Sequence, residues 1–151
     1  MTPKDGAVCI VVRGSKILLI RQTRDGRQYH GLPGGGIEPG ETPEQAALRE
    51  LWEECNVTGT IVKSLGSHIF PHMGTTVYSF QVDIGGQTPM LGQNLTEAEK
   101  QVLQEIRWLA LDEMCERDRA FLWAAGLSGI PEFFDELRSW GDDVNYPNRR
   151  L

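Results

Sequence analysis

The sequence has few cysteines, and this scarcity already excludes some classes of protein. Cys9, Cys55 and Cys115 cannot all pair with one another within one chain, and their spacing matches no zinc site. Cys9 lies in an apolar run and Cys55 on the apolar side of a predicted helix, so we expect both to be small buried hydrophobic residues. A disulfide-stapled scaffold is therefore excluded, and a reducing, cytoplasmic location is favoured.

Long apolar runs and an excess of basic residues are also missing. No run approaches the roughly 20 apolar residues that cross a bilayer, and no apolar segment of a secretion signal follows Met1. We therefore expect no membrane partner. Lys and Arg number 15 against 21 Asp and Glu, which gives a net charge of −6. Non-specific binding to a nucleic-acid polymer needs many basic contacts to phosphates, so we expect no such partner. A small phosphate-bearing substrate remains compatible if a metal ion mediates the contact.

The 151 residues fit one domain, which we place at residues 1–140, followed by a polar tail at 141–151. The order of apolar runs and capping signals indicates a mixed sheet with packed helices, an α/β (α+β) fold. Strands are expected at 6–13, 16–21, 58–67, 75–84 and 106–109, and helices at 43–55, 96–104, 111–125 and 131–140. Gly14 and Ser15 form a hairpin link between the first two strands, and residues 22–28 are expected to form a loop.

The clearest helix follows the Gly- and Pro-rich stretch at residues 32–41. Thr42 has the side chain of an N-cap, Pro43 suits the first helical position, and Gln45 completes a capping box. The helix is expected to end at Cys55, because Asn56 tolerates the left-handed conformation that terminates helices.

Projection at 100° per residue divides this helix into two sides. An apolar arc is expected to pack on the core and contains Ala47, Leu48, Leu51, Trp52 and Cys55. Glu50, Glu53 and Glu54 gather on the opposite side, where like charges three and four residues apart repel. A divalent cation would turn this repulsion into binding, and oxygen ligands suit Mg²⁺ or Mn²⁺. The alternative is a solvated acidic face on which Arg49 pairs with Glu53.

These residues form a longer pattern that resembles the signature of the Nudix (MutT-like) hydrolases. Gly35, five residues, Glu41, seven residues, and then the run 49–57, Arg-Glu-Leu-Trp-Glu-Glu-Cys-Asn-Val, match every fixed position of that signature except one. Asn56 stands where the family has glycine. His30 stands where members often have tryptophan, which puts substrate contact rather than metal binding in doubt.

The resemblance implies a Nudix-type α/β/α sandwich and a Mg²⁺-dependent hydrolase, with Mn²⁺ as a substitute. The substrate would be a nucleoside diphosphate linked to another group. The roles carried over are as follows: Glu50, Glu53 and Glu54 as catalytic and metal-binding residues, the Gly34 carbonyl as a further metal ligand, Arg49 and Glu41 as an orienting pair, and Arg21, Gly35 and Gly36 as substrate-binding residues. Homodimers are frequent in the family, so the resemblance leaves a homodimer open.

Several alternatives stay open at this point. The general base is not assigned, and Glu97, Glu99 or Glu105 could each add a later acidic ligand or remain a surface residue. Arg24 and Arg27 belong either to a solvated loop or to a site. The substrate could be a nucleoside triphosphate or an ADP-ribose-like nucleotide sugar. A catalytically silent nucleotide-sensing or protein-binding module is the alternative function, although such modules commonly lose glutamates that this chain keeps.

Overall fold

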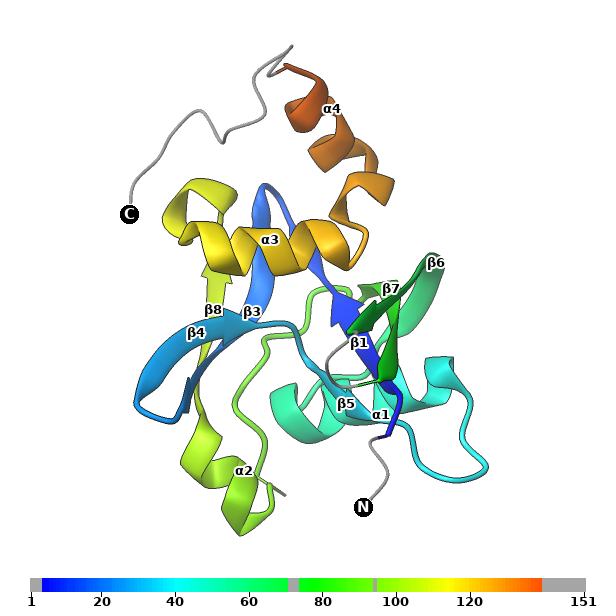
Figure 1. The fold of residues 1–151 in the computed structure, drawn as a ribbon, viewed down its shortest axis with the longest axis vertical. Helices are drawn as coiled ribbons and strands as arrows, with labels where there is room; N and C mark the ends of the chain where they lie inside the picture. The colour runs from blue at the N-terminus through cyan, green and yellow to red at the C-terminus, as the bar shows by residue number, and fades with distance from the viewer. Residues whose placement is uncertain (1–3, 71–73, 94, 140–151) are drawn as a thin grey trace.

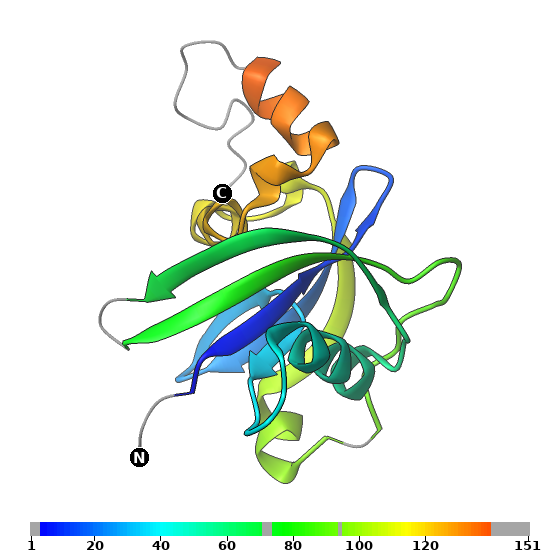
Figure 2. The same cartoon turned by 90° about the vertical axis from the view of Figure 1, so that its right-hand side faces the viewer.

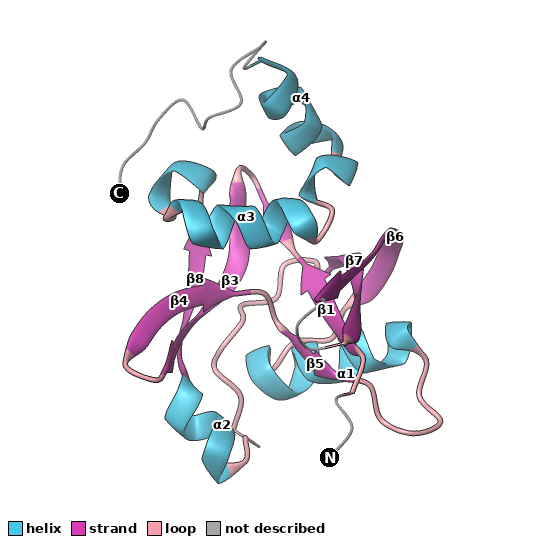
Figure 3. Cartoon of the chain, viewed as in Figure 1, coloured by secondary structure: helices cyan, strands magenta, loops and turns pink. Residues whose placement is uncertain are grey.

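The computed structural model describes residues 4–70, 74–93 and 95–139, and the predicted tail lies outside this range. Two four-stranded sheets form its centre (Figures 1 and 3). The first, ordered β5-β1-β7-β6, contains Gly34–Gly36, Gly6–Ile10, Thr75–Asp83 and Thr60–Phe70. The second contains β2, β3, β4 and β8, at Val12–Arg13, Lys16–Arg24, Arg27–Gly31 and Leu103–Leu109. The first sheet is mixed, since β1 and β7 are parallel and the other pairs are antiparallel.

Helices cover the sheets from two sides, which confirms the predicted α+β architecture. Helix α1, Pro43–Cys55, lies on one side, while α3, Glu116–Ala124, and α4, Pro131–Ser139, lie on the other (Figure 2). The short helix α2, Glu97–Val102, precedes β8. Two 3-10 turns, η1 at Leu111–Glu113 and η2 at Leu127–Gly129, flank α3. None of the described helices has the length and apolar character needed to cross a membrane.

The central strands β1 and β3 are buried on both faces, as their continuous apolar runs predict. Alternate side chains of these strands enter two separate hydrophobic clusters. Cys9, Leu18 and Ile20 pack with the apolar residues of α1, whereas Ile10 and Leu19 pack under α3 and α4. Cys9 and Cys55 are fully buried and unpaired, as expected. The sheets therefore hold α1 and α3 in fixed positions on opposite sides.

The expected loop at residues 22–28 is wrong, because most of it is a hairpin. Strand β3 runs on to Arg24, β4 starts at Arg27, and Asp25 and Gly26 form the turn with φ of 51° and 73°. An Asp-Gly pair at positive φ is the usual link of a two-residue hairpin. The strand predicted at 58–67 is shifted to Thr60–Phe70, and the strand predicted at 106–109 begins earlier, at Leu103.

The single helix predicted at 111–125 is interrupted. The backbone is extended at Met114 and Cys115, so a 3-10 turn and α3 replace one continuous helix. The buried Arg119 guanidinium donates hydrogen bonds to the carbonyls of Leu111 and Met114. These carbonyls would bond to backbone N–H groups in a continuous helix, so the arginine takes the place of the missing helical turn.

The predicted termini of α1 are confirmed. Thr42 and Gln45 form the reciprocal capping box, and Asn56 adopts φ 57° and ψ 36°, the left-handed conformation. The predicted division into an apolar and an acidic side is wrong at three positions. Trp52 is 48% exposed, whereas Glu50 and Glu54 are only 8% and 6% exposed. The helix packs on the glycine strand β5, whose lack of side chains leaves room for carboxylates.

Candidate active site

Glu50 and Glu54 lie one turn apart on α1 and both point toward the glycine strand. The backbone N–H of Gly34 donates a hydrogen bond of 2.9 Å to Glu54 Oε1. A Cβ added at Gly35 would lie 2.5 Å from Glu50 Oε1, which is too close for any real contact. Glycine at position 35 therefore makes the space that the Glu50 carboxylate occupies.

Arg49 connects the loop before α1 to the glutamates. Its Nε and Nη2 donate to the two carboxylate oxygens of Glu41, at 2.7 and 3.0 Å. Nη1 donates to Glu50 at 3.0 Å and to Glu53 at 3.2 Å, and Nη2 also reaches the Gly36 carbonyl at 2.9 Å. The Arg49 hydrogen bonds lower the pKa of Glu41, and the Glu41 hydrogen bonds raise that of Arg49. A planar guanidinium with fixed donors thus sets the orientation of the carboxylates around it.

A third carboxylate reaches the same place from α2. One oxygen each of Glu50, Glu54 and Glu99 lies within 4.8 Å of the others. Glu99 also accepts a hydrogen bond of 3.0 Å from the backbone N–H of Thr96, which caps α2. Of the three later acids considered, the structure therefore brings Glu99 to this group.

Burial disfavours the charged forms of Glu50 and Glu54. Burial raises the pKa of Glu54 to about 8, with the negative charges of Glu50 and Glu99 adding to the effect. Burial also raises the pKa of Glu50, although Arg49 opposes the shift. Removal of a carboxylate from water disfavours its charged form unless a compensating charge is present. Two buried carboxylates and the nearby Glu99 carboxylate offer the oxygen donors that suit a hard divalent cation.

The remaining predicted residues lie near this group in different ways. Glu53 is outside the set of three, and its carboxylate faces Arg49 with 33% of the side chain exposed. Arg21 pairs with Glu105 through a 3.0 Å contact between Nε and Oε2. Glu97 is 88% exposed beside Lys100. Gly34, Gly35 and Gly36 all border the pocket described next.

We call the hollow beside these acids the carboxylate pocket. Its volume is about 340 Å³. It is lined by Gln22, Arg24, Gly34, Gly35, Gly36, Glu50, Glu54, Ala98, Glu99, Val102 and Leu103. Sequence reasoning left Arg24 undecided, because it ended the strand at Arg21. Since β3 continues, Arg24 shares a face with the buried Gln22 two residues earlier, and the Asp-Gly turn was the signal that could have shown it.

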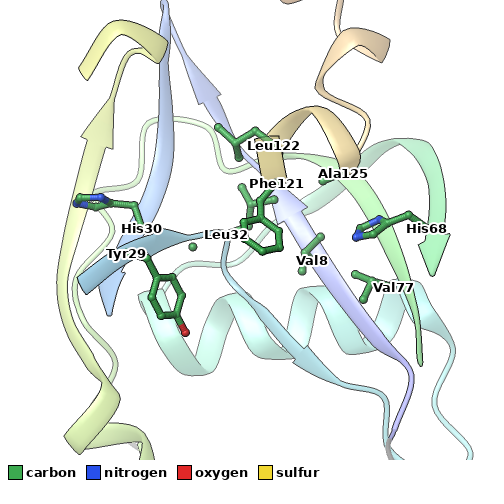
Figure 4. A pocket seen from close by; sticks show the side chains of 10 residues that line it. Val8, Tyr29, His30, Leu32, His68, Val77, Phe121, Leu122 and Ala125 are labelled. Carbon is green, nitrogen blue, oxygen red and sulfur yellow. The ribbon is translucent and has the colours of Figure 1, made fainter. Parts of the chain in front are cut away.

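Two further pockets lie nearby. The arginine pocket, of about 650 Å³, is lined by Arg24, Asp25, Arg27, Tyr29, Arg117 and Phe121. The apolar pocket, of about 190 Å³, is lined by Val8, Tyr29, His30, Gly31, Leu32, His68, Val77, Phe121, Leu122 and Ala125. In Figure 4, Tyr29 and His30 lie at one end, His68 and Val77 lie at the other, and Phe121 lies between them.

Comparison with known proteins identifies the family of this chain. The family model of the NUDIX domain matches residues 3–128. The chain belongs to this family. The solved NUDIX hydrolase from Nitrosomonas europaea is 24% identical, with a TM-score of 0.67 over 97% of this chain and 77% of that one. At this level of identity the likeness shows the NUDIX fold and not a shared activity.

Two curated relatives of the NUDIX chain carry functional names. The NAD-capped RNA hydrolase NudC of Pseudomonas putida is 29% identical over 126 residues, 83% of this chain and 46% of the relative. The putative mutator protein MutT4 of Mycobacterium tuberculosis is 33% identical over 131 residues, 82% of this chain and 50% of the relative. The chain thus spans about half the length of these relatives.

Proposed function

We propose that this NUDIX chain is a divalent-metal-dependent hydrolase that cleaves a pyrophosphate bond in a nucleoside diphosphate linked to another group. The observation that carries the proposal is the convergence of Glu50, Glu54 and Glu99 from two helices beside the glycine strand. Buried like charges are retained at a cost in stability, and a cation between them removes that cost. Membership of the NUDIX family, in which the similar NudC protein is named a hydrolase, supports the same conclusion.

Glu50, Glu54 and Glu99 would hold Mg²⁺ or Mn²⁺, with the neighbouring Gly34 carbonyl and Glu53 as further ligands. When bound, the metal would neutralise phosphate oxygens and lower the pKa of a water molecule. The chain itself supplies positioning. Arg49 holds Glu50 and Glu53 in place through the contacts given above, and a glutamate of this group would accept the proton of the attacking water.

The substrate-binding residues follow from the lining of the carboxylate pocket. Gly35 and Gly36 expose backbone at its wall, where a phosphate can approach closely. Arg24 adds a positive charge at the same wall. Arg21 remains a candidate for phosphate contact, since release from Glu105 would free its guanidinium.

The substrate we propose is a small nucleotide, either a nucleoside triphosphate or an ADP-ribose-like nucleotide sugar. A net charge of −6 opposes binding of a long nucleic-acid polymer. One relative is named an NAD-capped RNA hydrolase, so NAD-type dinucleotides belong in the test beside the triphosphates and nucleotide sugars.

The test is a phosphate-release screen with Mg²⁺ across triphosphates, oxidised triphosphates, ADP-ribose, nucleotide sugars and dinucleotides. We expect Glu54→Gln, Glu53→Gln and Glu99→Gln each to lower kcat, by about 100-fold or more for the two on α1, as loss of a metal ligand does. Glu97→Gln is the matched control, because it lies on the same short helix but is 88% exposed.

Two results would contradict the proposal. Full activity in a Glu53→Gln, Glu54→Gln double variant would contradict the proposed metal-dependent mechanism. Tight nucleotide binding without turnover of any compound would instead favour the silent-module alternative, and ligand-induced thermal shifts with the same compounds would measure that binding.

A further inference from the structure

The three pockets are linked by shared lining residues and therefore lie side by side. Arg24 lines both the carboxylate pocket and the arginine pocket. Tyr29 and Phe121 line both the arginine pocket and the apolar pocket. A ligand that places a pyrophosphate at the carboxylates and a ring in the apolar pocket would therefore pass the arginines between them.

The arginine pocket, the middle one of the three, is positively charged. Arg24, Arg27 and Arg117 line it together with one acid, Asp25, which leaves two more positive than negative side chains there in a chain of net charge −6. Arg117 is partly engaged, since it donates 2.8 Å to the Gln28 carbonyl and lies 3.4 Å from an Asp118 oxygen.

Arg24 and Arg27 lie directly opposite each other in the β3–β4 hairpin. Gln22 and Tyr29 form the next pair on the same face of the hairpin, because strand partners two residues along point the same way. Like charges that face each other across strands destabilise the pair. Both arginines are exposed, and over residues 4–70, 74–93 and 95–139 neither forms an ion pair with a carboxylate. An anion between them would relieve their repulsion.

We propose that the arginine pocket binds a further phosphate of the substrate, distinct from the pyrophosphate that is cleaved. This phosphate is a monoester or diester on the nucleotide, for example at a ribose hydroxyl. Guanidinium groups suit this ligand because their paired donors match phosphate oxygens. The nucleotide identity of the ligand rests on the proposed function, whereas recognition of a phosphate rests on the arginines alone.

Calorimetry of the metal-free protein tests the inference with two pairs of compounds. The first pair is ADP-ribose and its 2′-phosphate. The second is NAD and NAD extended by one nucleotide at its adenosine 3′-hydroxyl, which adds a phosphodiester. In one of the two pairs, we expect the compound that carries the additional phosphate to bind about tenfold more tightly than its partner, because a guanidinium forms charge-assisted hydrogen bonds with a phosphate. The pair that shows it identifies the monoester or the diester, and high salt should reduce the preference.

The variants Arg24→Gln and Arg27→Gln should each reduce that preference by about threefold or more. Both residues are exposed, so neither change should prevent folding. Arg138→Gln is the control, since its guanidinium is exposed on α4 beside Asp135 and lines none of the three pockets. Equal affinities within both pairs, or a preference that survives in both pocket variants, would overturn the inference.

Hydrolysis of the same compounds with Mg²⁺ separates this inference from the proposed function. A binding preference without turnover of any compound would contradict the proposed hydrolase and leave the phosphate subsite supported. Turnover of both members of each pair, with equal affinities and no effect of the arginine variants, would contradict the subsite alone.

Discussion

At the residue scale, the absence of a side chain at position 35 is as necessary to the candidate site as the carboxylates themselves. A Cβ there would meet both oxygens and the carboxyl carbon of Glu50 at 2.5 to 2.9 Å. A Cβ on the neighbouring Gly36 would approach only the flexible side chain of Lys4, at 3.1 Å or more. The two adjacent glycines therefore differ in whether their position has room for a side chain, although the sequence alone does not distinguish them.

This difference predicts unequal effects of two identical substitutions. Gly35→Ala should displace the Glu50 carboxylate and weaken Mn²⁺ binding by about tenfold, the low end of the effect expected when support of a metal ligand is lost. Gly36→Ala should leave the dissociation constant within about a factor of two, because the lysine can move. Titration of both variants with Mn²⁺, followed by electron paramagnetic resonance, would measure the two constants. Equal constants would show that the Glu50 position does not matter for the metal.

The sequence carries the local part of this site but not the long-range part. Glu50 and Glu54 could be predicted because their spacing on one helix follows from the helical period. Glu99 could not be separated from Glu97 and Glu105, since its approach depends on how α2 packs beside α1. Sequence periodicity also predicted an exposed acidic side, whereas the structure buries it against glycines.

At the scale of single elements, the ends of helices and strands could be predicted where their capping and turn residues were recognised. The capping box at Thr42 and the left-handed Asn56 correctly predicted the two ends of α1. The Asp25–Gly26 turn was passed over as a loop, and this error hid the position of Arg24. The break before α3 depends on the buried Arg119, whose contacts with nearby carbonyls no periodic pattern reveals.

Asn56 provides a test at this scale. Asn56→Ala should lower the free energy of unfolding by about 1 kcal/mol, because alanine lacks the short polar side chain that lets asparagine adopt φ 57° at low cost. Asn56→Gly should change it by less than about 0.5 kcal/mol, since glycine accepts that conformation and loses more chain entropy on folding. Urea unfolding of the three proteins would give the values. Equal stability of the Ala and Gly variants would mean that the helix ends differently in solution.

At the scale of the whole molecule, the candidate site opposes folding stability when no metal is bound. The pKa of Glu54 is raised to about 8, whereas an unfolded chain has an ordinary Glu pKa near ~4.3. Between these two values the folded state binds more protons than the unfolded state. The free energy of unfolding must then fall as the pH rises through this window.

We therefore expect metal-free wild-type protein to lose more stability than Glu54→Gln between about pH 5 and about pH 8. The lowered pKa of His68 makes both proteins more stable as the pH rises toward ~6.5, the ordinary pKa of histidine. The raised pKa of Glu50 acts in the opposite direction in both proteins, so the difference between them reports mainly on Glu54. Added Mg²⁺ should remove the excess loss, because a metal ligand must be deprotonated. Urea midpoints across this range would measure the effect, and parallel curves for the two proteins would refute it.

The three carboxylates differ in how firmly the molecule holds them. Glu50 and Glu54 belong to a 13-residue helix fixed on the hydrophobic core, whereas Glu99 belongs to a six-residue helix with no buried residue. Segments with few buried apolar contacts open at low cost in free energy. In the proposed metal site, Glu99 would thus adjust to cations of different radius while Glu50 and Glu54 stay fixed. The affinity for a given metal and the ordering of α2 would then be coupled, so that a change in one would shift the other.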